Sequence, residues 1–129
     1  MLRAAGLLGT PLHIVDLMAW GWEDPAGALA RIDSARTEGL DVTVDVRLTP
    51  RADAVRRDVP LGLSHPGMIL AGDGGGGFLR ASAPHLADPR ALADVLSRVT
   101  LLPARRLEGM APVLQEKGRI RPGAAADLL

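Results

Sequence analysis

A strand, a helix and a second strand follow one another in residues 12–47, and this order constrains the fold more than any other feature of the sequence. Residues 12–15 form an apolar run that predicts a short buried strand. Residues 41–47 alternate strictly between polar residues and valines, which predicts a strand with one apolar face. A strand–helix–strand unit of this length predicts two parallel strands joined by a right-handed crossover.

The helix between these strands has a start signal, an apolar stripe and a stop signal. Asp24 followed by Pro25 is typical of a helix start, with a capping side chain and then proline in the first turn. Gly39 is typical of a helix end. The stripe at helical spacing consists of Ala28, Leu29, Ile32 and Ala35.

The rest of the chain continues the alternation of strands and helices. Residues 68–71 predict a third buried strand, and Asp88 followed by Pro89 predicts another helix start. Thr100 is expected to cap a short helix that reaches residue 107, and residues 118–129 are expected to be turn-rich and extended. The pattern predicts an α/β fold with a parallel sheet. A closed (β/α)₈ barrel takes about 250 residues, so 129 residues can form only part of one.

Composition excludes several classes of protein. Lys plus Arg and Asp plus Glu number 15 each, which argues against binding to nucleic acid or to an anionic membrane surface. The chain has no cysteine, so disulfides and thiolate metal ligands are excluded. The apolar run in residues 4–12 is interrupted and has no clear cleavage site, and no stretch has the length of a membrane span. We therefore expect a cytoplasmic protein.

Polar side chains follow each predicted strand, where parallel α/β proteins carry their functional groups. His13 and Asp16 lie around the end of the first strand, Asp45 and Arg47 lie at the end of the second, and Asp73 follows the third. A carboxylate such as Asp73 can bind a cation and can accept a proton from a metal-bound water.

Each of these sites also has a purely structural interpretation. His13 can be a hydrogen-bonded core histidine, Asp45 and Arg47 can form a salt bridge on a solvent-exposed strand face, and Asp73 can be a turn residue. The glycines at residues 74–77 lack the lysine of a phosphate-binding P-loop.

Residues 64–129 contain three segments that resemble the amidohydrolase superfamily, and most closely its N-acyl-D-amino-acid deacylase (D-aminoacylase) branch. Residues 64–74, SHPGMILAGDG, resemble the family segment with hP and migSDg. Residues 100–107, TLLPARRL, resemble its TxlPArrlgl helix, and residues 118–128, GRIRPGAAADL, match its GrIxpGxxADlv signature. Upstream, PLHIVDL at residues 11–17 resembles pvhISHlk, and residues 32–46 resemble iDxArxeGldVtaDvyPY.

The resemblance implies a TIM-barrel fold in which residues 1–117 form a partial barrel and residues 118–129 return toward a small β-domain with the start of a strand. It implies a zinc-dependent hydrolysis of a C–N bond, such as the amide of an N-acyl-D-amino acid. By motif position, Asp73 would be the catalytic acid and base, and the metal ligands would be Asp73, Asp16 and His13. Asp16 stands where the family has a metal-binding histidine, and Arg47 stands near another metal-side position.

The family's N-terminal HxH metal motif has no counterpart in this sequence. We therefore expect an amidohydrolase-type fragment that is inactive by itself and takes a small N-acyl amino acid-like substrate. Two alternatives stay open: a small α/β binding or interaction domain that keeps only the scaffold, and one half of a two-chain hydrolase. Exposed strands in a partial barrel would favour an oligomer or a partner chain that completes it.

Overall fold

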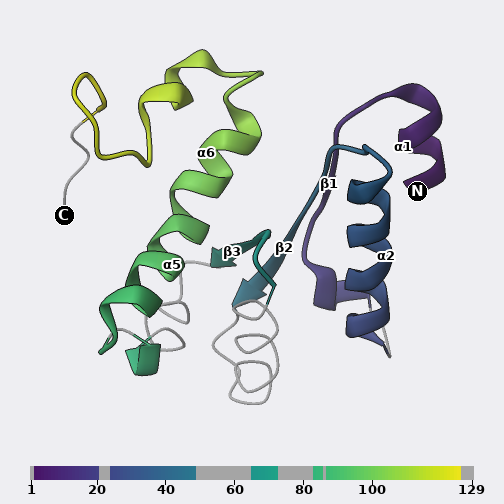
Figure 1. The fold of residues 1–129 in the computed structure, drawn as a ribbon, viewed down its shortest axis with the longest axis horizontal. Helices are drawn as coiled ribbons and strands as arrows, with labels where there is room; N and C mark the ends of the chain where they lie inside the picture. Colours follow the sequence, from purple (N-terminus) through teal and green to yellow (C-terminus); the bar gives the residue numbers. More distant parts are fainter. Residues whose placement is uncertain (1, 21–23, 49–64, 73–82, 86, 126–129) are drawn as a thin grey trace.

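The computed structural model describes residues 2–20, 24–48, 65–72, 83–85 and 87–125. Strands and helices alternate along the chain, and the helices stand on either side of a small central sheet (Figure 1). The elements are α1 (Leu2–Leu8), β1 (Leu12–Ile14), η1 (Leu17–Trp20), α2 (Pro25–Thr37), β2 (Val42–Leu48), β3 (Met68–Gly72), η2 (Ala83–His85), α5 (Pro89–Val99), α6 (Leu101–Leu107) and η3 (Pro112–Glu116).

The sheet has three strands in the order β1-β2-β3, and both pairs are parallel. His13 pairs with Thr43 between β1 and β2, and Asp45 pairs with Ile69 between β2 and β3. The predicted parallel α/β architecture is therefore confirmed. Its relationship to a closed barrel stays a prediction.

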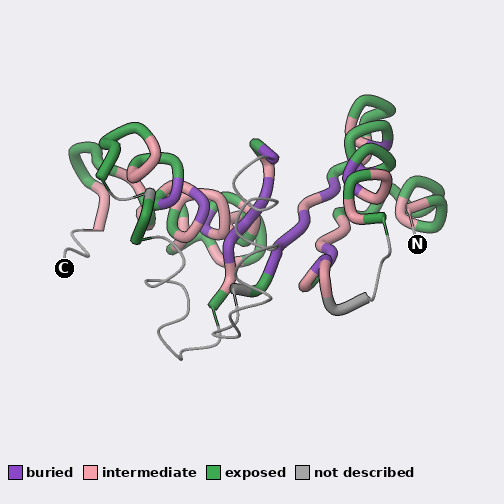
Figure 2. The backbone as a smooth tube through the Cα atoms, turned by 90° about the horizontal axis from the view of Figure 1, so that it is seen from below, coloured by how far each residue is buried: buried purple, intermediate pink, exposed green. Residues whose placement is uncertain are grey.

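The two faces of β2 differ in chemistry, as the alternation of its residues predicts. Val42, Val44 and Val46 are buried together with Ile14 of β1 and Met68 and Leu70 of β3. The helix α2 packs on this face through Leu29, Ile32 and Ala35. Figure 2 shows that burial is concentrated in the strands, whereas the outer sides of the helices are exposed. Burying each large apolar side chain of this core contributes about 1.5–3 kcal/mol.

The start and end signals of α2 act as the sequence predicts. The Asp24 carboxylate accepts a hydrogen bond from the Gly27 backbone N–H at 2.9 Å, which satisfies one of the free donors of the first turn. At the other end, Gly39 has φ +89°, a conformation that side-chain-bearing residues rarely adopt. The chain can therefore turn directly from α2 into β2.

Thr100 holds the predicted N-cap position of α6, but the predicted cap by its side chain does not form. No hydrogen bond from its side chain caps α6; the Thr100 hydroxyl instead donates to the Leu96 carbonyl at 2.6 Å. Threonine at a helix end has this alternative because a carbonyl four residues earlier lies within its reach. The helices α5 and α6 thus follow each other with only Thr100 between them.

Residues 2–8, for which no secondary structure was predicted from the sequence, form the helix α1, and Leu7 and Leu8 on it are exposed. The tail has the predicted turns but differs from the expectation in one respect. Residues 118–125 form turns, so the described part of the tail does not contain the predicted start of a β-domain strand. Gly118 and Gly123 both have positive φ in this tail, a geometry that favours turns over a strand.

None of the described helices has the length and apolar character needed to cross a membrane.

Candidate functional site

Polar side chains gather on the second face of the sheet, from Thr43 at the start of β2 to the carboxyl ends of β1 and β2. We call His13, Asp16, Thr43, Asp45 and Arg47 the strand-end cluster. His13 and Thr43 are direct neighbours in the β1–β2 register, and Asp45 lies two residues beyond Thr43 on the same face. Parallel pairing therefore brings residues together that are about 30 positions apart in the sequence.

His13 is hydrogen-bonded through both ring nitrogens. Its Nε2 lies 3.0 Å from Asp45 Oδ2, and its Nδ1 lies 2.8 Å from the Thr43 hydroxyl. Because a carboxylate only accepts hydrogen bonds, Nε2 carries the proton and donates to Asp45. In the neutral ring, Nδ1 then accepts from Thr43. The His13 side chain keeps 27% of its surface exposed, so it lies at the edge of the site and outside the apolar core.

Asp45 is the centre of the strand-end cluster. Its second oxygen, Oδ1, accepts a hydrogen bond of 2.6 Å from the Asp16 backbone N–H. Only 8% of Asp45 is exposed, so the interpretation of Asp45 as part of a solvent-exposed strand face is wrong. The physical reason is that the turn after β1 folds over the strand and presents a backbone donor to the carboxylate.

Asp16 has an unusual backbone conformation in this turn. Its φ is 50°, and among the described residues it is the only one other than glycine with a positive φ. The Asp16 carboxylate lies 3.7 Å from Arg47 Nε, which is a long distance for an ion pair. Backbone strain of this kind is found often at functional sites and persists where surrounding contacts fix it. Here the bond to Asp45 provides such a contact.

The cluster holds a hydroxyl, an imidazole and a carboxylate in one hydrogen-bonded row. The carboxylate fixes the orientation and tautomer of His13, which leaves Nδ1 as the basic nitrogen. In this arrangement His13 can accept a proton from Thr43 or from a bound molecule that replaces it.

The described part of this site does not fit a zinc ion. Both nitrogens of His13 are engaged, and the Asp16 carboxylate faces the cation of Arg47. No group of three or more His, Asp or Glu side chains in the described ranges is arranged to hold a metal ion. A zinc ligand needs a free lone pair, whereas these atoms already have partners within the protein. Asp73, the predicted catalytic residue and metal ligand, lies outside the described residues.

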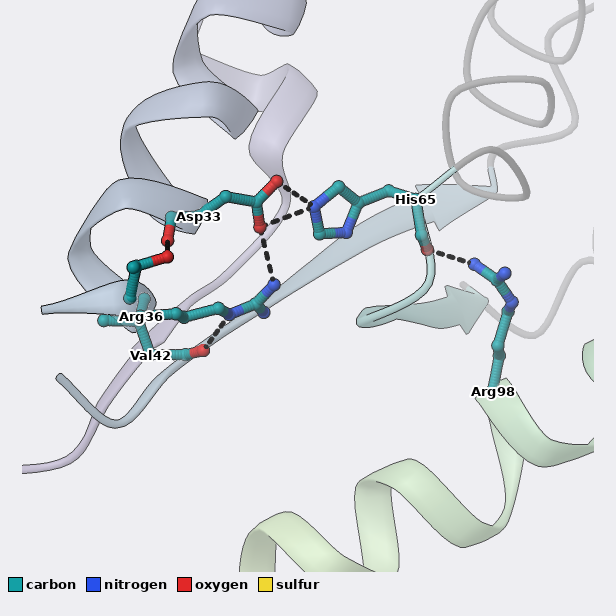
Figure 3. A network of polar contacts seen from close by, with 6 residues as sticks. Asp33, Arg36, Val42, His65 and Arg98 are labelled. Carbon is teal, nitrogen blue, oxygen red and sulfur yellow. Dashed lines mark hydrogen bonds and ion pairs between the residues drawn. The ribbon is translucent and has the colours of Figure 1, made fainter. Parts of the chain in front are cut away.

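A second polar network lies at the starts of β2 and β3, and sequence reasoning missed it. We call Asp33, Arg36, His65 and Arg98 the strand-start cluster (Figure 3). His65 Nε2 lies 3.0 and 3.1 Å from the two carboxylate oxygens of Asp33. Arg36 donates to the Val42 carbonyl at 2.8 Å and to Asp33 at 3.2 Å. The end of α2 is thereby tied to the start of both β2 and β3.

Arg98 extends this network to α5. Its Nη1 donates to the His65 carbonyl at 2.5 Å, and its Nε donates to Asp94 at 2.8 Å. Only 4% of Arg98 is exposed, which is rare for arginine. His65 is also buried, and its Nδ1 has no hydrogen-bond partner among the described residues. Nothing local in the sequence marks this cluster, because His65 and Asp33 are 32 positions apart.

Comparison with known proteins gives no relative. No family model matches the chain, and no curated protein and no solved structure matches it. The resemblance to amidohydrolases therefore remains a prediction from the motifs.

Proposed function

We propose that the chain is part of an amidohydrolase-type (β/α) barrel that serves hydrolysis of a C–N bond, such as the amide of an N-acyl-D-amino acid. The observation that carries the proposal is the strand-end cluster on a parallel sheet. Enzymes built on parallel α/β barrels place their reacting groups at the carboxyl ends of the strands. The motif resemblance in residues 64–129 supports the same assignment and names the reaction class.

In this proposal the 129 residues do not catalyse hydrolysis by themselves. His13 and Asp45 are bonded to each other, and Arg47 faces Asp16. A zinc ion at this end of the sheet would need Asp73 together with ligands that the sequence lacks, such as the HxH pair of the family. Zinc is therefore proposed as the cofactor of the completed barrel.

A specific observation favours completion by another chain or by a second copy. Among the described residues, β1 and β3 are each paired on one side only. Within the described part of the chain, their outer edges have no strand partner, and such edges commonly pair with further strands. The two-chain hydrolase and an oligomer are both consistent with these edges.

The competing proposal is a small binding or interaction domain that keeps the scaffold without the reaction. The closed hydrogen bonding of the strand-end cluster favours it, because either ring nitrogen of His13 would have to give up its present partner to bind a metal. The two proposals differ in whether activity can be restored by added strands.

The test is complementation. The purified chain is mixed with the HxH-bearing part of an N-acyl-D-amino-acid deacylase, and hydrolysis of N-acyl-D-amino acids is measured with bound zinc. We expect no turnover by the chain alone and turnover by the assembly, which Asp73→Asn abolishes. A folded assembly without turnover would contradict the hydrolase proposal and favour the binding domain. Turnover with stoichiometric zinc by the chain alone would contradict its inactivity.

A further inference from the structure

An open pocket of about 300 Å³ lies where β2 and β3 begin, and Thr43 of the strand-end cluster is one of its lining residues. It is lined by the starts of β2 and β3, by the last turn of α2 and by one side of α6. Its walls include three arginines, Arg36, Arg105 and Arg106, and one carboxylate, Asp41. Guanidinium groups from two separate helices therefore border one small volume.

Arg36 is held rigidly at this pocket. Its Nε donates to the Val42 carbonyl at 2.8 Å, and its Nη1 donates to Asp33. The guanidinium lies directly against Gly67, where an added Cβ would come within 2.9 Å of Nη1. Glycine at position 67 thus leaves room for this cation, and hydrogen bonds fix its orientation before any ligand arrives.

The two arginines of α6 differ in how they are engaged. Arg106 is largely buried, with 12% of its side chain exposed, and its Nη1 donates to Asp41 at 2.8 Å. Arg105 is exposed and has no hydrogen bond or ion pair with any residue in the described ranges. Even when Asp33 is counted together with Asp41, the three arginines exceed the carboxylates by one positive charge.

We propose that this pocket binds the phosphate group of a small phosphorylated molecule. One bidentate arginine occupies both oxygens of a carboxylate, whereas a phosphate has enough oxygens to bind several guanidinium groups at once. The volume lies at the lower limit of ligand pockets, which restricts the ligand to a small molecule. Val42, Ile69 and Leu102 provide apolar surface beside the arginines for the organic part. This inference does not rest on the hydrolase proposal, because the three arginines that carry it do not belong to the strand-end cluster.

The test is a titration of the ¹⁵N-labelled full chain with inorganic phosphate at constant ionic strength, with acetate as a parallel ligand. We expect saturable amide shifts at Gly67 and the end of α6 with phosphate, and markedly weaker binding of acetate. Arg105→Ala should weaken phosphate binding roughly fivefold, and Arg105→Lys should weaken it less, because lysine keeps the charge and loses the planar fork. Arg105 has no partner in the described fold, so its replacement should leave the folded spectrum intact.

Arg90→Ala is the matched control, because Arg90 is exposed on α5 and does not line the pocket. This variant should bind phosphate as the unmodified chain does. The proposal is overturned if phosphate causes no saturable shifts, if acetate binds as tightly, or if Arg90→Ala and Arg105→Ala lose the same affinity.

Discussion

The two histidine clusters lie on the same small sheet and are built differently. In the strand-end cluster His13 is part-exposed, and both of its ring nitrogens have partners. In the strand-start cluster His65 is buried, and its backbone carbonyl and one ring nitrogen tie α5, α2 and β3 together. Parallel barrels commonly separate function and stability in this way, with reactive groups at strand ends and structural ties at strand starts. The comparison predicts that substitutions in the strand-start cluster affect stability most.

The largest effect is expected for Arg98→Ala. The change removes the hydrogen bond from the buried guanidinium to the His65 carbonyl, and it also removes the packing of the aliphatic part of the Arg98 side chain. We expect the free energy of unfolding to fall by about 3 kcal/mol, measured by urea denaturation. Arg90→Ala on the exposed side of the same helix should change it by less than about 0.5 kcal/mol. Equal losses in the two variants would show that Arg98 is not a structural tie.

A smaller loss is expected for Asp45→Ala in the strand-end cluster. The change leaves the Asp16 backbone N–H and His13 Nε2 without their acceptor, which should lower the free energy of unfolding by about 2 kcal/mol. Asp45→Asn keeps one oxygen for the Asp16 N–H and should lose only about 1 kcal/mol. Both variants are measured by thermal and by urea denaturation. If Asp45→Asn loses as much stability as Asp45→Ala, the hydrogen bond from the Asp16 backbone does not stabilise the turn.

Asp33→Asn should cost less, because the Asp33 side chain is 53% exposed. We expect the free energy of unfolding to fall by about 1 kcal/mol. The substitution removes the negative charge of Asp33, which contacts both His65 and Arg36, and keeps the shape of the side chain. A double-mutant cycle with His65→Gln should give a coupling energy of about 0.5 kcal/mol or more. Strictly additive losses would mean that the contact between the two side chains contributes nothing.

The smallest effect concerns the backbone of Asp16. Because its φ is positive, Asp16→Gly should raise the free energy of unfolding by about 0.5 kcal/mol, whereas Asp16→Ala should lower it by about as much. Both variants lose the contact with Arg47, so their difference isolates the backbone term. A glycine variant that is no more stable than the alanine variant would show that the turn is unstrained.

The sequence predicted the parts of the fold that depend on local patterns. The valine alternation predicted β2, and the Asp-Pro pairs predicted the starts of α2 and α5, because each signal lies within a few residues. The burial of Asp45 could not be predicted, since alternation assigns a residue to a face of the strand but does not say what covers that face. The tie between His65 and Asp33 was not predictable either, because only the tertiary fold brings these residues together.

For the candidate site, His13, Asp16, Asp45 and Arg47 were selected from their positions after predicted strands, and the structure brings these four together. Thr43 was missed as a member, although its place in the alternating run puts it on the same strand face as Asp45. Which contacts form within the set depends on the β1–β2 register and on the turn at Asp16. Neither the register nor the conformation of this turn can be predicted from a single sequence.

The central claim is that the strand-end cluster is closed on itself and is not a metal site in this chain. The most direct measurement is ¹⁵N NMR of the His13 ring nitrogens during a zinc titration. We predict a proton on Nε2, an Nδ1 that accepts from Thr43, and no change in either nitrogen at one equivalent of zinc. A zinc-dependent shift of a His13 nitrogen that disappears in Asp16→Asn or Asp73→Asn would contradict the claim.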